Sequence, residues 1–383
     1  MKTLEKKVLE LDEQITVSKC FVFHADICNS VKDFVDKICS EVARWDKTFH
    51  DVRPLKTGSL FVGLKVGLPY AADYVSQDSA SKEENVEPFC DCLYEMITDV
   101  PLLDDRWKIR EVHRNRVGVT MTMICTLDET NDVGFSLDLV PVFKSGDYFE
   151  RGLEFTTSAE RYLQNKGIFD NCPRDLFTLL SPARDYKCDT GLIVSRILAT
   201  LDEEQKLGFK IAKYLLQNGV LFEFVVEYKH KSNDNLMLFG YDGLIKSFHL
   251  RLCFLQLLFK TFDTEMGKEL TGGTLALCLL DMIKETFMFF STRDEENENP
   301  CFTEPIMKDD SLEYKFSLKW NNRSFVYLAK DVKEVTDLFM TDVVSGDLSR
   351  YKLLNYSDNM CADVCSKSGR RKNSALEALL ESI

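Results

Sequence analysis

Residues 57–75 read TGSLFVGLKVGLPYAADYV, and this stretch decides the fold expected for the front half of the chain. Four glycines and prolines punctuate its β-branched and aromatic residues, which is typical of a strand pair joined by turns. Gly58 and Ser59 form a turn ahead of a strand, where backbone N–H groups and a hydroxyl are suited to holding a phosphate. Asp73 adds a carboxylate near the end of the same stretch.

Two more strands are predicted downstream, at 117–127 and 135–143, joined by a turn that ends near Gly134. In the second strand apolar residues alternate with others, so Asp138 is expected to point away from the apolar face. Carboxylates on neighbouring strands, here Asp73 and Asp138, suit Mg²⁺, which takes few protein ligands and completes its shell with water and phosphate oxygens. Such a cation neutralises charge during in-line attack on a nucleotide phosphate. The alternative is that both acids are solvated strand-end residues.

Helical periodicity governs the N-terminus and the back half of the chain. A first helix is expected over 2–16 and a second over 30–49, capped by Asn29 or Ser30. After about residue 155 the clearest helical patterns lie at 193–217, 244–262 and 274–290. The predicted class is therefore α+β, with a mixed-sheet lobe followed by a helical lobe.

Residues 312–329 alternate instead like a β-hairpin around Asn321 and Asn322. The stretch after about residue 310 is accordingly expected to form a small β-rich appendage.

Cys90-x-Cys92 and Cys361-x₃-Cys365 have no companion pair at zinc-finger spacing, so we interpret these cysteines as ordinary buried thiols.

The composition sets further limits on the function. With 383 residues, 45% apolar and 29% charged, the chain is expected to bury a sizeable core, which excludes wholesale disorder and a disulfide-dense scaffold. Its net charge of −14 disfavours a globally basic nucleic-acid binder. The charged N-terminus and the lack of an 18-residue apolar run predict a cytoplasmic protein without a membrane span, whose 13 cysteines are reduced.

Three quoted segments carry a family resemblance: Thr57-Gly58-Ser59, Leu64-Lys65-Val66 and Pro69-Tyr70-Ala71-Ala72-Asp73. Together they resemble the active-site strand of the animal cyclic GMP-AMP synthase-like receptors, which are nucleotidyltransferases. That family has a Gly-Ser motif, a carboxylate–x–carboxylate pair after a proline, and a third carboxylate on a later strand, matched here by Asp138. The resemblance covers roughly residues 30–305.

The resemblance implies an architecture and an activity. The architecture is a nucleotidyltransferase lobe with an N-terminal spine helix in residues 1–190, a helical lobe in 191–310 that completes the nucleotide cleft, and an extension in 311–383. The activity is that of an innate immune sensor that uses Mg²⁺ or Mn²⁺ to join ATP and GTP into a cyclic dinucleotide.

Weaker matches in the back half imply nucleotide contacts. Ser195-Arg196-Ile197-Leu198 resembles the family's Trp-Arg-x-Ser stretch, and residues 247–251 resemble its Ser-Tyr-x-x-Lys segment. The implied nucleotide-binding set is Gly58, Ser59, Arg196, Glu203, Lys213, Ser247, Phe248 and Arg251. The alternatives are a Lys213 that extends from its helix into solvent, a core aromatic at Phe248, and surface ion pairs for the two arginines.

Two departures from the family pattern matter. Residues 204–212 contain no Cys or His, so the zinc insertion that precedes the lysine helix in the vertebrate member is absent. The first carboxylate of the pair falls on Ala71, whose methyl group cannot bind Mg²⁺, and Asp78 has the wrong spacing to replace it. Because the three acids act as a unit, transfer should fall by orders of magnitude. The chain is then either an impaired synthase or a catalytically silent nucleotide-binding scaffold.

A basic stretch at 106–116 places Trp107 among arginines, a lysine and a histidine. In the resembled family a basic face recognises double-stranded RNA or DNA, which suits readout of shape and phosphate. The alternative interpretation is a solvated edge strand of a hairpin.

Overall fold

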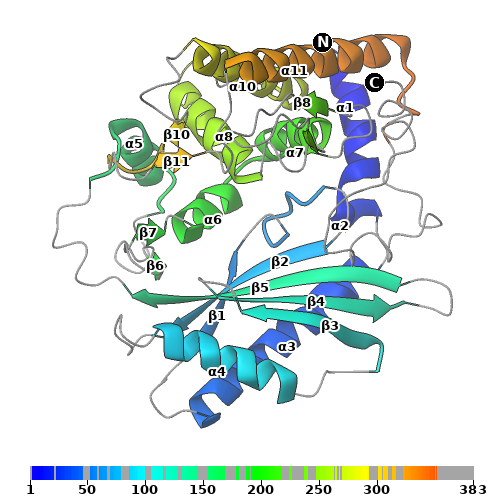
Figure 1. Cartoon of the computed structure of the whole chain (residues 1–383). Coiled ribbons are helices and arrows are strands. Elements are labelled where there is room, and N and C mark those ends of the chain that lie inside the picture. The colour runs from blue at the N-terminus through cyan, green and yellow to red at the C-terminus, as the bar shows by residue number, and fades with distance from the viewer. Residues whose placement is uncertain are drawn as a thin grey trace.

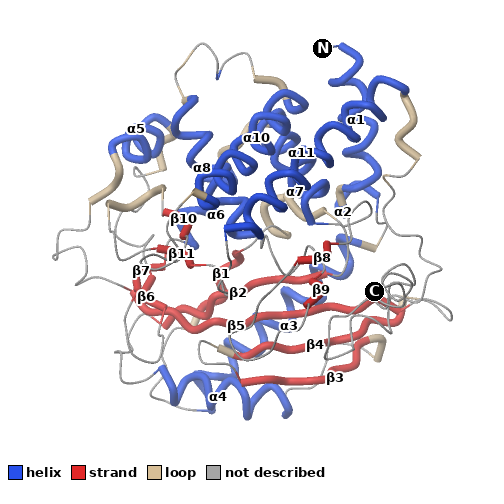
Figure 2. Tube along the Cα trace, turned by 45° about the horizontal axis from the view of Figure 1, so that its top comes forward, coloured by secondary structure: helices blue, strands red, loops and turns tan. Residues whose placement is uncertain are grey.

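The structure is a computed structural model that describes residues 2–20, 23–45, 52–57, 60–66, 70–78, 86–99, 105–114, 118–127, 132–144, 154–168, 178–180, 187–189, 191–217, 224–226, 237–239, 247–262, 264, 267, 270–292, 301–303, 305–308, 313–315, 322–349 and 351. Two separate hydrophobic cores organise these residues, one beneath a β-sheet and one among helices. The helical layer lies over the sheet (Figures 1 and 2). The predicted α+β class is confirmed.

The sheet lobe is built on a mixed sheet with the strand order β1-β2-β5-β4-β3, which β6 and β7 extend beyond β5. Its strands are β1 (Arg53–Thr57), β2 (Tyr70–Asp78), β3 (Trp107–Arg114), β4 (Val119–Thr126), β5 (Asp132–Lys144), β6 (Thr178–Leu180) and β7 (Lys187–Asp189). The β2–β5 pair is parallel, and the other pairs are antiparallel.

Two helices, α3 (His24–Trp45) and α4 (Val86–Asp99), cover one face of this sheet (Figure 1). Alternate residues of the strands point into that core because side chains of a strand alternate between its two faces. The strand residues buried in this core are Trp107, Val119, Met121, Met123, Cys125, Val133, Phe135, Leu137 and Leu139. The other face of the sheet is turned toward the helical lobe (Figure 1).

The helical lobe holds the larger core. Its helices are α1 (Lys2–Ile15), α2 (Val17–Cys20), α5 (Thr157–Asn165), α6 (Gly191–Ala199), α7 (Glu203–Gln217), α8 (Ser247–Thr261), α10 (Gly272–Ser291) and α11 (Asn322–Ser345). Two short hairpins add β8 (Phe224–Val226) with β9 (Met237–Phe239), and β10 (Cys301–Thr303) with β11 (Glu313–Lys315). Among the described residues, no helix is both long and apolar enough to cross a membrane.

The amino end of α10 lies against α1 and α7. Thr271 caps it with a capping box, and carboxylates from the other two helices complete the cap. Glu5 accepts from the Gly273 N–H at 3.3 Å, and Glu204 accepts from the Gly272 N–H at 2.5 Å. Because this end of a helix carries partial positive charge, two acids there are stabilising. The helical lobe is thus tied together at the point where three helices meet.

Several predicted elements agree with the structure, and others are corrected. The helix expected at 2–16 and the strands expected at 117–127 and 135–143 are confirmed. The second helix begins at His24, so the cap predicted at Asn29 or Ser30 is wrong.

The C-terminal part is corrected more strongly. Residues 322–329 lie inside α11, so the hairpin predicted for 312–329 is wrong in its second half, and residues 316–321 lie outside the described residues. Both α1 and α11 contribute to the helical core. The β-rich appendage expected after residue 310 is therefore wrong for α11, whereas the division into 1–190, 191–310 and 311–383 stays a prediction.

Close packing of α7 on α10 gives a first prediction. A Cβ at Gly208 would lie 2.8 Å from the Cβ and Cγ of Leu275. Overpacking of this kind costs about 1–3 kcal/mol, which exceeds the helix-propensity gain of about 1 kcal/mol on replacing glycine by alanine. Gly208→Ala should therefore lower the free energy of unfolding, measured by urea titration.

The control removes the side chain that the new methyl group would meet. In a Leu275→Gly background, which also removes the Cβ of residue 275, Gly208→Ala should raise the free energy of unfolding, because only the propensity gain remains. If the substitution has the same effect in both backgrounds, the close approach of the two helices is not the cause.

Candidate functional site

The two candidate metal ligands occupy one register position in the sheet. Asp73 of β2 pairs directly with Asp138 of β5 in the parallel ladder. Neighbouring strands lie about 4.8 Å apart, and residues at the same register position lie on the same face. Positions 73 and 138 therefore share one side of the sheet. The same pairing sets Ala71 opposite Ser136.

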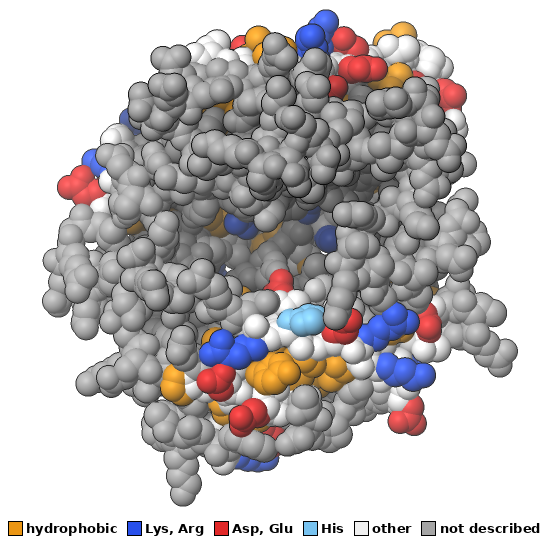
Figure 3. All heavy atoms as spheres, viewed as in Figure 1, with side chains coloured by type: hydrophobic (Ala, Val, Ile, Leu, Met, Phe, Trp, Pro, Cys, Tyr) orange, Lys and Arg blue, Asp and Glu red, His pale blue; other side chains and the backbone are white. Residues whose placement is uncertain are grey.

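This side of the sheet is the one that faces the helical lobe. Leu137 and Leu139 are fully buried against the α3–α4 core, whereas Asp138 between them is only partly buried. The expectation that Asp138 points away from the apolar face is confirmed. The surface is hollowed between the two lobes, with basic side chains on the upper wall and an acidic side chain at the floor (Figure 3).

The carboxylate of Asp138 is held by a neighbouring strand. Thr120 of β4 is its direct cross-strand partner, and the Thr120 hydroxyl donates to Asp138 Oδ1 at 2.6 Å. Sequence reasoning missed Thr120. The period-2 pattern of β4 was available, but the pairing register that sets Thr120 opposite Asp138 is a tertiary property.

The turn predicted to bind phosphate follows β1. Thr57, immediately before Gly58, pairs with Asp73 in the antiparallel β1–β2 ladder. Gly58 and Ser59 themselves lie outside the described residues.

The segment 60–66, which precedes β2, runs from one core to the other. Leu60 is buried in the sheet-lobe core, whereas Leu64 and Val66 are buried in the helical core. Val66 also forms an isolated bridge with Thr16, where α1 ends.

Lys213 of α7 contacts this same segment. The lysine is only 3% exposed, and its Nζ donates to the Leu64 carbonyl at 3.4 Å. The interpretation of Lys213 as a lysine that extends into solvent is therefore wrong. The phosphate contact implied for it stays a prediction.

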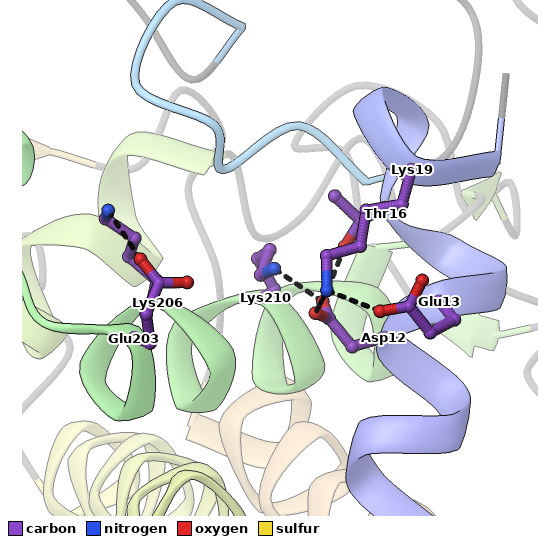
Figure 4. Close-up of polar contacts among 7 residues, drawn as sticks. All are labelled: Asp12, Glu13, Thr16, Lys19, Glu203, Lys206 and Lys210. Atoms are coloured by element: carbon purple, nitrogen blue, oxygen red, sulfur yellow. Dashed lines mark hydrogen bonds and ion pairs between the residues drawn. The ribbon is translucent and has the colours of Figure 1, made fainter. Parts of the chain in front are cut away.

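A buried ion cluster fixes α7 to the α1–α2 junction (Figure 4). Asp12, only 3% exposed, accepts from Lys210 Nζ at 2.5 Å, from Lys19 Nζ at 2.8 Å and from the Thr16 hydroxyl at 2.5 Å. Burial alone raises the pKa of Asp12, but the three hydrogen bonds outweigh it and hold the pKa below its ordinary value. Hydrogen bonds to Asp12 and Glu13 raise the pKa of Lys19 to about 12.

The remaining predicted residues are distributed over three helices. Arg196 is exposed on α6, and Glu203 is exposed in the first turn of α7, where it accepts from Lys206 at 3.0 Å. Ser247 and Phe248 begin α8, but their side chains lie outside the description. Arg251 is partly buried on α8, and no acceptor among the described residues meets its Nε. A surface ion pair is absent for Arg196 and Arg251 within the described part of the chain.

Two of the four cysteines singled out in the sequence lie in α4. Cys90 and Cys92 are buried cysteines of α4, as predicted, while Cys361 and Cys365 fall outside the described residues. In the part of the chain that is described, no three His, Cys, Asp or Glu side chains are grouped for a metal.

Residues 107–114 of the basic stretch form β3, an edge strand with exposed cations. Arg106 pairs with Asp26 at 2.7 Å, and Arg114 pairs with Asp91. Part of the basic charge is thus neutralised locally.

Comparison with known proteins identifies the fold. No protein-family model matches the sequence, and no curated protein matches it. A structure of CdnC from E. coli MS115-1 with ATP matches with a TM-score of 0.51 and 12% identity, over 91% of this chain and 96% of that one. The CdnC:HORMA-deltaN complex matches with a TM-score of 0.50 and 13% identity, over 91% and 95%.

CdnC is a bacterial cyclic oligonucleotide synthase and a nucleotidyltransferase, so this chain has the nucleotidyltransferase fold. At such low identity the likeness concerns the fold alone. It does not single out the animal receptors that the motifs resemble.

The buried ion cluster gives the second prediction. Asp12→Asn would leave Lys210 buried without its countercharge, which costs about 3–5 kcal/mol of unfolding free energy. Because the pKa of Asp12 is lowered in the folded state, this contribution is complete above about pH 4 and is lost as the pH falls through the folded-state value. Urea unfolding of both proteins should show a gap at pH 7 that narrows below about pH 4.

Glu13→Gln is the matched control, since Glu13 is exposed, lies next to Asp12 and shares its partner Lys19. It should change stability by about 0.5 kcal/mol or less. Equal losses in the two variants would mean that burial of the pair is not what stabilises the junction.

Proposed function

We propose that this protein is a nucleotidyltransferase of the cyclic-nucleotide-synthase type that binds ATP and GTP with Mg²⁺ or Mn²⁺, and that Ala71 impairs its transfer step. The observation that carries the proposal is the pairing of Asp73 with Asp138 on the face of the sheet that is turned toward the helical lobe. Membership in the animal receptor family and a role in innate immunity rest on the ordered sequence motifs.

The available ligands fit a hard cation. Two acids at one register position offer the carboxylate oxygens that Mg²⁺ prefers, and the hollow between the lobes leaves room for water and phosphate oxygens. When bound, the cation neutralises charge on the reacting phosphates.

The chain's own residues then bind and orient the nucleotide. Asp73 and Asp138 hold the cation, and Gly58 and Ser59 hold the triphosphate. Of the cations implied by the resemblance, Lys213 and Arg251 neutralise phosphate charge, and Arg196 contacts a phosphate or a base. Phe248 stacks on a base, while Ser247 and Glu203 complete the implied nucleotide contacts.

Position 71 limits the chemistry. Ala71 faces no acid across the ladder, because its partner is Ser136, whose hydroxyl carries no charge. The set therefore has two carboxylates where the resembled family has three. Two acids suffice to bind a cation together with a nucleotide, but transfer loses a ligand that acts in concert with the others.

A second candidate function is a catalytically silent scaffold that is regulated by nucleotide binding. The observation that favours it is Ala71 itself. In this case the cleft binds ATP or GTP with a cation, and restoring a carboxylate at position 71 yields no product.

One substitution separates the two functions and supplies the third prediction. Ala71→Glu protein, incubated with Mg²⁺ or Mn²⁺, ATP and GTP, with and without double-stranded RNA or DNA as trial activators, should form a cyclic dinucleotide detectable by mass spectrometry. The unsubstituted protein should form it orders of magnitude more slowly. Asp138→Asn in the Ala71→Glu background should abolish the product and is the control.

Other outcomes decide against one or both functions. Thermal stabilisation by ATP or GTP with the cation, but no product from Ala71→Glu under any activator, would favour the scaffold. Absence of stabilisation by every nucleotide would remove both proposals.

A further inference from the structure

We propose that Thr120 is a positioning residue for Asp138: its hydroxyl binds one carboxylate oxygen and leaves the other for the cation. This inference deepens the proposed function and rests on it. Thr120 itself touches neither the cation nor the nucleotide in this assignment.

The hydrogen bond has a fixed direction and a short length. An ionised carboxylate only accepts, so the Thr120 hydroxyl donates to Asp138 Oδ1, at 2.6 Å. Lengths of about 2.5–2.7 Å are typical of O–H···O⁻ bonds, which are stronger than neutral ones. The contact therefore orients the carboxylate as well as occupying one of its oxygens.

The backbone around Thr120 holds the donor in place. Thr120 and Asp138 are direct partners in the β4–β5 ladder. Gly118, just before β4, approaches the Leu139 carbonyl so closely that a Cβ there would lie 2.3 Å from its oxygen. Threonine is also β-branched, which restricts its χ1 rotamers. The hydroxyl thus has little freedom to leave the carboxylate.

Orientation of a ligand in advance lowers the cost of binding a cation. A carboxylate already fixed in one rotamer loses less conformational freedom when the cation arrives. Residues that hold metal ligands in this way typically change metal affinity by about 10–100-fold when they are removed.

The next threonine along the strand supplies a matched control. Thr122 lies two residues further on β4, on the same face as Thr120, and pairs with Ser136 instead of a carboxylate. Thr122→Val therefore makes the same exchange of a hydroxyl for a methyl group on the same strand, at a position that is not paired with Asp138.

The experiment measures how much Mn²⁺ the full chain needs to bind ATP. The readout is the Mn²⁺ concentration at half-saturation, from the shift in unfolding temperature at fixed ATP. Thr120→Val should raise this concentration about tenfold, whereas Thr120→Ser, which keeps the hydroxyl, and Thr122→Val should stay within about twofold of the parent. In an Asp138→Asn background, Thr120→Val should have no further effect on it.

The outcomes separate this inference from the proposed function. If the parent binds ATP in a Mn²⁺-dependent way and Thr120→Val has the same half-saturation, Thr120 is only structural and the inference fails alone. If the parent shows no Mn²⁺-dependent binding of ATP or GTP, the proposed function fails. Should Thr120→Val unfold before assay, Thr120→Ala serves as the second variant, with the same expected increase.

Discussion

The parallel pairing of β2 with β5 is the constraint on which the candidate site depends. It aligns two strands from distant parts of the sequence so that Asp73 and Asp138 meet at one register position. A shift of one residue would move one of the two acids to the α3–α4 face, where the core is apolar. The buried Leu137 and Leu139 penalise that shift, so the hydrophobic core also fixes the placement of the polar residues.

The sequence predicts those parts of the site that depend on a local period. Alternation alone places Asp138 on the other face of the sheet from Leu137 and Leu139, because strand side chains alternate strictly between faces. Thr120 could not be found in this way, since its role depends on which residue of β5 it pairs with. Lys213 shows the same limit for helices, because the helical period does not reveal that its amine meets the Leu64 carbonyl. In α11, an alternation of aromatic residues favoured a hairpin, but packing against α10 gives a helix whose Phe325 stacks on Phe287.

The two lobes are linked by more than chain connectivity. Segment 60–66 contributes to both cores, and its far end is held by the α1–α2 junction and by α7. The buried Asp12 with its two lysines fixes that junction. Segment 60–66, which lies between β1 and β2 in the chain, is therefore positioned by helices that lie outside the sheet.

The place of α1 in the helical core has a consequence for dissecting the molecule. Its apolar residues Leu4, Val8, Leu11 and Ile15 lie among the helices of the back half, and Glu5 caps α10. A fragment that starts at α3 would lack α1, and the helical core would lose the apolar side chains that α1 contributes. Such a fragment would expose the apolar surface that α1 covers and lose solubility. Removing the N-terminus is therefore a poor way to prepare an isolated lobe, because α1 and α11 belong to the same core.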